Sequence, residues 1–269
     1  MKITAIISRL CLLAVSAYAD EAISAAAKKI FEEKQDCVLW VSAVAKTTFS
    51  AEGSSDSAMN FPDQENKMEA LGTVIDPEGL VVASLSQIDP SRNFSGRVVR
   101  GVKMEATSTL KEVKVTLADG TEIPAVVVMK DTDLDLAFLR IKMDSKEARG
   151  VKLKAVDLKD SGTGNIMDRT VTITRMDEVL NRVASVNTGE INMITKKPRV
   201  FLRAGGGVGG CPTFLANGKL LGITTARMVK NRNPVGVILP ASDVLEIAEQ
   251  AKAAKAEETK AEETKSEKN

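Results

Sequence analysis

Short apolar stretches that alternate with polar residues and end at turns run through much of this chain. Residues 113–117 alternate in this way, Asp119-Gly120 follows, and residues 123–129 form the next apolar stretch. Alternation with a period of two is typical of a strand with one buried face, and an Asp-Gly pair favours the tight turn of a hairpin. The segment therefore predicts two antiparallel strands.

Further strands are expected along the chain, and segments with a helical pattern are few. The expected strands are residues 136–141, 171–173, 183–186 and 191–194, with turn residues between them. Many short strands favour barrels or a sandwich, and 269 residues suffice for two such units. Aromatic residues make up only 3% of the chain, so the core must consist of aliphatic residues and Met. We predict an all-β fold.

Composition excludes several classes of partner and cofactor. Lys and Arg number 37 against 36 Asp and Glu, a net charge of +1 that gives no electrostatic affinity for nucleic acid. The chain has no histidine, and its cysteines lack the paired spacing of a metal site. We therefore expect no metal, no cofactor and no nucleic-acid partner.

The first 19 residues are typical of a signal peptide. Lys2 and Arg9 accompany two short apolar stretches, and Ala17-Tyr18-Ala19 matches the small-x-small pattern of a cleavage site. We expect cleavage after Ala19, export to the periplasm or the exterior, and no membrane association afterwards. The alternative is an uncleaved membrane anchor.

Helical patterns are confined to the two ends of the mature chain. Residues 20–35 predict an N-terminal helix, and a second helix is expected after Ser242. Residues 249–269 form a Lys/Glu-rich tail that contains a tandem KAEET repeat, expected to be disordered or a frayed helix that solubilises the chain or binds a partner. Residues 47–70 are polar with little periodicity and predict a long exposed loop.

Removal of the signal peptide leaves Cys37 and Cys211. In an oxidising compartment they could form a disulfide, whose geometry is strict. The alternative is that both are buried as small apolar residues.

Four segments together resemble the HtrA family of serine proteases. Residues 72–89, GTVIDPEGLVVASLSQID, resemble the family pattern GVIIDxxGYVVTNNHVVD, and residues 115–137 are similar to VTLxDGxxxxAxVVxxDxxxDLA. Residues 207–223 resemble GNSGGP followed by NGxLIGI, and residues 236–240 resemble the closing GFAIP strand. The matches follow the family's order at compatible spacing across residues 36–248.

The resemblance implies two chymotrypsin-like, six-stranded antiparallel β-barrels, over about residues 36–145 and 146–240, with an active site in the cleft between them. The N-terminal and C-terminal helices would flank this two-barrel domain. Only the low-complexity tail follows residue 248, so we expect no PDZ domain.

The three positions of the catalytic triad do not hold the residues that the chemistry needs. The resemblance places Ser86 at the catalytic histidine, Gly209 at the nucleophilic serine and Asp135 at the aspartate. A Ser hydroxyl cannot shuttle a proton at neutral pH, and glycine has no side chain to acylate. Asp135 is expected to bond to backbone or to Ser86 instead. We therefore predict a catalytically inactive homologue.

The glycine loop keeps a second feature of the family site. In an active relative the amides at Gly207 and Gly209 would form the oxyanion hole, and with Gly210 they could here bind a carboxylate or a peptide carbonyl. The alternative is a flexible, empty loop.

Three functions agree with this sequence. The first is an exported binding protein that holds an extended peptide or a protein partner in the old substrate cleft or at a barrel edge. The second is a hydrolase with a relocated active site. The third is a regulatory subunit, either a homo-trimer or a mixed oligomer with an active HtrA-like paralogue, assembled through the N-terminal segment.

Overall fold

The computed structural model describes residues 21–51, 64–93, 98–99, 102–227 and 234–266. Its first sheet is a closed barrel, because the sixth strand in spatial order pairs back with the first. The order is β1 (Val38–Ala51), β2 (Gln64–Asp76), β3 (Leu80–Ser84), β7 (Leu136–Ile141), β6 (Glu122–Asp131) and β5 (Val102–Thr116), and the two-residue β4 (Val98–Val99) pairs antiparallel with the start of β5.

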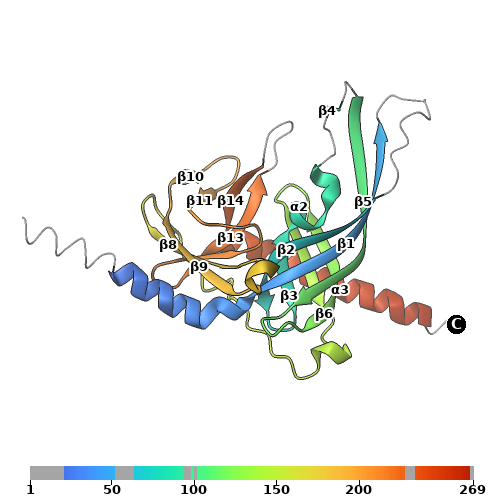
Figure 1. Ribbon diagram of the computed structural model, residues 1–269, viewed down its shortest axis with the longest axis horizontal. Coiled ribbons are helices and arrows are strands. Elements are labelled where there is room, and N and C mark those ends of the chain that lie inside the picture. The colour runs from blue at the N-terminus through green and yellow to red at the C-terminus, as the bar shows by residue number, and fades with distance from the viewer. Residues whose placement is uncertain (1–20, 52–63, 94–97, 100–101, 228–233, 267–269) are drawn as a thin grey trace, which may run out of the picture.

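The predicted hairpin around Asp119-Gly120 is confirmed as β5 and β6, with Val113 opposite Ala125. The prediction of a long loop over residues 47–70 is wrong over much of its length. Strands β1 and β2 pair as far as Thr47 and Gln64, and β1 continues along β5. The ends of β1 and β5 project beyond the barrel (Figure 1). A strand in solvent needs no apolar face, so its sequence carries no periodic signal.

The second sheet has seven strands and stays open. Its order is β10 (Met193–Thr195), β11 (Phe201–Arg203), β14 (Val235–Pro240), β13 (Leu220–Arg227), β12 (Pro212–Leu215), β8 (Arg169–Arg175) and β9 (Ala184–Glu190). Among the described strands, β9 and β10 do not pair with each other. Between them Ile191 exchanges backbone hydrogen bonds with Met167 and Asp168 of a loop.

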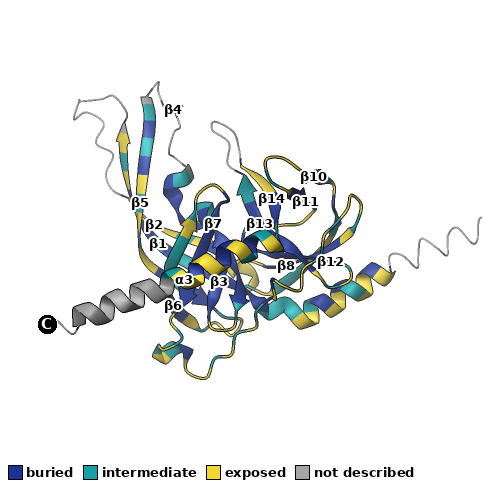
Figure 2. Cartoon of the chain, turned by 180° about the vertical axis from the view of Figure 1, so that it is seen from behind, coloured by how far each residue is buried: buried dark blue, intermediate teal, exposed yellow. Residues whose placement is uncertain are grey.

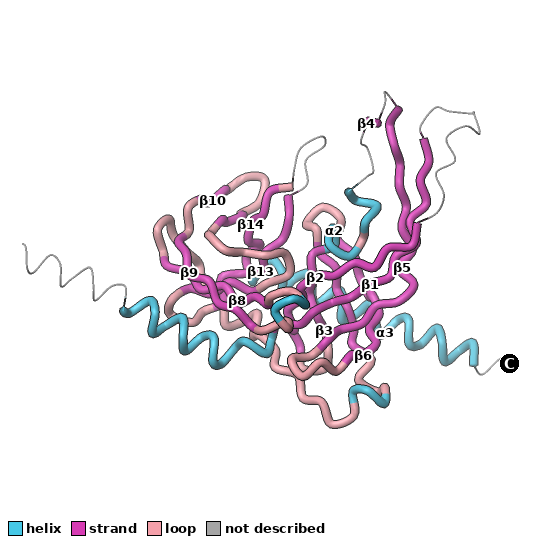
Figure 3. The backbone as a smooth tube through the Cα atoms, in the orientation of Figure 1, coloured by secondary structure: helices cyan, strands magenta, loops and turns pink. Residues whose placement is uncertain are grey.

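The predicted all-β, chymotrypsin-like double barrel is therefore confirmed, with one closed six-stranded barrel and one half-barrel in place of two six-stranded barrels. The connection between them, residues 142–168, is a loop whose one described helical turn is η4 (Lys146–Ala148), as Figure 3 shows.

The two terminal helices pack on a core shared by both sheets. The N-terminal helix, residues 21–34, buries Ile23, Ala27 and Ile30 and leads into η1 (Gln35–Cys37). Their cluster also contains Phe138 of the closed barrel and Phe214 of the half-barrel. The apolar face of this helix is thus covered by the chain's own core.

Helix α3 (Ala241–Ser266) begins one residue before the predicted N-cap Ser242 and includes most of the Lys/Glu-rich tail. Its buried side, with Val244, Ile247, Ala248 and Ala251, faces the same core (Figure 2). The predicted signal peptide lies outside the described residues. Within the described residues, no helix is both long and apolar enough for a membrane span, and no group of His, Cys, Asp or Glu could hold a metal.

Candidate functional site

The carboxylate of Asp135 is the centre of the site between the two sheets. β3 ends at Ser84 and the short helix α2 (Leu85–Ile88) begins directly after it, which brings Ser86 beside Asp135. Asp135 precedes β7, has a positive φ of 58°, and accepts a backbone hydrogen bond from Leu85 at 3.0 Å. Asp and Asn tolerate this left-handed conformation better than most residues.

Every oxygen of the Asp135 carboxylate has partners, although the side chain is fully buried. Oδ2 accepts from Ser84 Oγ at 2.6 Å, Ser86 Oγ at 3.1 Å and the Ala226 amide at 3.2 Å. Oδ1 accepts from the Ser86 amide at 2.7 Å. The expectation that Asp135 bonds to backbone and to Ser86 is confirmed.

Arg92, in the helical turn η3 (Pro90–Asn93), supplies the positive charge. Its Nε lies 3.7 Å from Asp135 Oδ1, and its Nη2 donates to the Thr132 carbonyl at 2.7 Å. A guanidinium stays protonated at any physiological pH. It balances the carboxylate but cannot act as a base.

Gly209 lies against the same cluster, so the structure brings the three triad positions together. A Cβ on Gly209 would lie 2.9 Å from Ser84 Cβ and 3.1 Å from Gln87 Nε2. A side chain at position 209 would therefore require Ser84 to shift and the Gln87 side chain to move slightly.

The backbone amides of the glycine loop differ in whether they already donate a hydrogen bond. Within the described part of the chain, no acceptor is found for the amides of Gly207 and Gly209. Gly210 instead donates to the Thr224 carbonyl at 2.8 Å, has a φ of +83°, and would overlap the Leu71 carbonyl if it carried a Cβ. Gly210 therefore packs the loop against the closed barrel, and its amide is not free for the predicted binding role, which stays a prediction.

An open groove of about 320 Å³ adjoins the loop on the half-barrel side. Among the described residues, Arg203 is its only charged lining residue, and Thr224 contributes a buried hydroxyl that has no hydrogen-bond partner there. The described lining residues are Asn192, Arg203, Ala204, Gly205, Gly206, Gly207, Thr224, Gly236, Val237 and Ile238.

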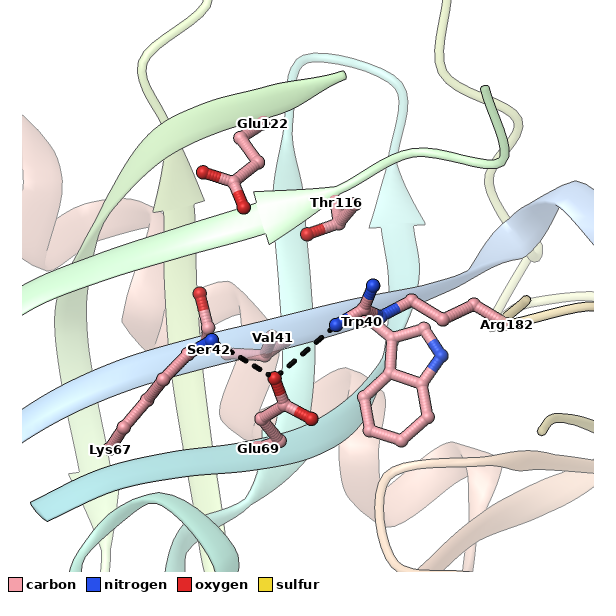
Figure 4. A pocket seen from close by; sticks show the side chains of 8 residues that line it. All are labelled: Trp40, Val41, Ser42, Lys67, Glu69, Thr116, Glu122 and Arg182. Atoms are coloured by element: carbon pink, nitrogen blue, oxygen red, sulfur yellow. Dashed lines mark hydrogen bonds and ion pairs between the residues drawn. The ribbon is translucent and has the colours of Figure 1, made fainter. Parts of the chain in front are cut away.

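A smaller pocket of about 10 Å³, between β1, β2 and the β8–β9 hairpin, is chemically different (Figure 4). Glu69 pairs with Lys67 and with Arg182, each at 3.3 Å, and Arg182 lies over the Trp40 ring. The Trp40 indole donates to the Met176 carbonyl at 3.0 Å. This pocket therefore lies where the two sheets meet, and its charged side chains already form ion pairs.

Cys37 and Cys211 are free and buried in the shared core, so the structure contains no disulfide between them. Burial raises the pKa of the Cys37 thiol to about 12 and raises that of Cys211 as well. Each cysteine occupies the small apolar role that was the alternative to a disulfide.

The sequence pointed to Ser86, Asp135, Gly207 and Gly209 but missed Ser84, Gln87 and Arg92. Ser84 and Gln87 flank the lost histidine in the resembling segment, so their position was a usable signal. The sequence contains no comparable signal for Arg92 and Arg203. Each reaches its site through strand register and helix geometry, which a single sequence does not show.

A closed barrel and a half-barrel that meet at a buried aspartate and a glycine loop define a protein of the trypsin-like class. The profile of the trypsin-like peptidase domain matches residues 70–223, more than half of the chain, and the chain belongs to that family. It is also a distant HtrA-like homologue: it is 29% identical over 159 residues to the serine protease Do-like HtrA of Bacillus subtilis (strain 168). That alignment covers 55% of this chain and 34% of the relative.

Proposed function

We propose that this chain is an exported, non-catalytic trypsin-like domain that binds an extended peptide or a protein segment in its old substrate cleft. The observation that carries the proposal is the cluster at Asp135. Gly209 offers no nucleophile, and Ser86 offers no general base at neutral pH. The carboxylate that would orient an imidazole is bonded to two serines, two amides and Arg92.

A relocated active site is the alternative, and Cys211 is the obvious replacement nucleophile. It is fully buried, and its raised pKa keeps the thiol protonated. A thiolate nucleophile needs exposure and a lowered pKa. The surroundings of Cys211 therefore favour a packing role.

Binding is supported by what the cleft leaves unoccupied. The amides of Gly207 and Gly209 have no acceptor among the described residues, and Gly207 is exposed and lines the groove. Such amides suit a peptide carbonyl or a carboxylate. Export is supported by the signal-like residues 1–19.

Assembly as a trimer or with an active paralogue is a further alternative that gains little support. The apolar residues Ile23, Ala27 and Ile30 of the N-terminal helix are already buried. Light scattering of residues 20–269 at high concentration tests this alternative directly. A concentration-independent trimer would revive it.

The decisive test is an activity assay of residues 20–269 with unfolded casein and a fluorophosphonate serine probe. We expect neither turnover nor labelling. Turnover that one substitution in the cleft abolishes would overturn the proposal. The matched variant carries Ser86→His and Gly209→Ser together, and we expect it to stay inactive because Gln87 and Ser84 fill the space of the new serine.

A further inference from the structure

We infer that the groove beside the glycine loop binds a carboxylate carried by the peptide or protein ligand. The inference rests on the proposed function and names the chemistry of its ligand. The groove is about 320 Å³, large enough for a side chain with adjoining backbone.

The charge of the groove is the first argument. Arg203 ends β11 with an exposed side chain, and the described lining of the groove contains no acidic residue. In the described part of the chain Arg203 has no ion pair, whereas Arg182 pairs with Glu69 and Glu178 and Arg199 pairs with Asp243. A guanidinium offers five donors in a planar fork that matches a carboxylate.

The neutral groups of the groove add donors in the same place. Thr224 Oγ1 is buried without a partner among the described residues, and a Cβ on Gly207 would lie 2.8 Å from it. The hydroxyl and the free Gly207 amide therefore share one wall. Asn192 contributes a further amide side chain. Buried polar atoms are normally hydrogen-bonded, so an unpartnered hydroxyl beside free amides indicates a missing ligand.

The size of the groove allows the carboxylate to belong to a chain. Ala204, Val237 and Ile238 complete its lining, but Val237 and Ile238 are buried in hydrophobic clusters, so the open surface of the groove is mainly polar. A carboxylate has two oxygens that accept from several donors at once, and here the guanidinium, the hydroxyl and the amides supply them. The source is either an Asp or Glu side chain or the C-terminus of the ligand.

The test measures binding of short capped peptide pools to residues 20–269 by calorimetry or fluorescence anisotropy. One central position is fixed as Glu, Gln, Lys or Leu, and the others are mixtures. A second pair of pools lacks acidic residues and ends in a free carboxylate or an amide. We expect the Glu pool, or the free-carboxylate pool, to bind about five- to tenfold more tightly than its neutral match.

Variants locate the effect. Arg203→Gln should abolish the preference and Arg203→Glu should transfer it to the Lys pool, while Lys196→Gln, an exposed cation outside the groove, should leave it unchanged. Equal binding of charged and neutral pools would overturn the carboxylate site and leave the proposed function standing.

Absence of binding by every pool would instead overturn the proposed peptide-binding function. Acetate then tests the groove alone by amide NMR. Shifts at Gly205, Gly206 and Gly207 that Arg203→Gln removes would uphold the carboxylate site, and unchanged spectra would overturn it.

Discussion

The two halves of the cleft differ in what surrounds their charged groups. At the Asp135 corner, donors from β3, α2 and β13 and the guanidinium of Arg92 surround one carboxylate, although Gln87 Oε1 and Arg92 Nε have no hydrogen-bond partner among the described residues. At the Arg203 groove, the guanidinium has no ion pair, and a buried hydroxyl and free amides have no hydrogen-bond partner in the described chain. A charge that is bonded on several sides holds the fold together, whereas a charge next to an opening is available to a ligand.

The largest effect is expected where the corner loses its carboxylate. Asp135→Ala removes the ion-pair partner of Arg92 and the acceptor of the Ser84 hydroxyl and places alanine at a φ of 58°, so it should lower the free energy of unfolding by about 3–5 kcal/mol. Denaturant unfolding measures this. Asp133→Ala removes an exposed carboxylate two residues away and is the matched control. Equal, small losses in both variants would show that the corner is not structural.

The loop behind the corner gives the second prediction. Gly210→Ala should cost about 2–4 kcal/mol, because its φ of +83° is strained for alanine and the new Cβ would overlap the Leu71 carbonyl. Gly218→Ala, at a φ of +87° with nothing within 4 Å, should cost only about 1 kcal/mol. Thermal unfolding of the two variants separates close packing from backbone strain, and similar losses would refute the packing role of Gly210.

The buried thiols under the loop predict a dependence on alkaline pH. The unfolded Cys37 thiol loses its proton near its ordinary pKa of 9.0, whereas the folded thiol keeps it until about pH 12. The unfolded state therefore releases protons first, and this contribution to stability is complete below pH 9 and decreases toward pH 12. At pH 10.5 the loss should be about 2 kcal/mol. Cys37→Ala should flatten the decrease between pH 9 and 11, and an unchanged slope would contradict the assignment.

The occupied nucleophile position predicts a coupling between two residues. Gly209→Ser should destabilise the chain by about 1–2 kcal/mol, because its side chain meets Gln87 and Ser84. Gln87→Ala should recover part of that loss when combined with it. A double-mutant cycle from urea unfolding should give about 1 kcal/mol of coupling, and strict additivity would show that the corner has room for a serine.

The sequence was sufficient where one residue type decides the outcome. The Asp119-Gly120 pair predicted the β5–β6 hairpin, whereas the loss of triad chemistry that the absence of histidine and the glycine at 209 predict stays a prediction. It was insufficient where pairing partners decide. The open edge between β9 and β10 depends on Ile191 bonding to a loop, and the Arg92 contact with Asp135 depends on a helical turn after α2. Both need three-dimensional register that local patterns do not contain.

Thr224→Val should have the smallest effect on stability, and it tests directly whether the Thr224 hydroxyl has a structural partner. The buried Thr224 hydroxyl has no partner in the described protein, so replacing it with a methyl group of similar shape removes a desolvation cost and no hydrogen bond. The free energy of unfolding should stay within about 0.5 kcal/mol or rise slightly. Thr172→Val is the matched control, because its hydroxyl bonds to Thr213 at 2.9 Å and its loss should cost about 1–2 kcal/mol. If Thr224→Val destabilises as much as Thr172→Val, the hydroxyl has a structural partner and is not available to a ligand.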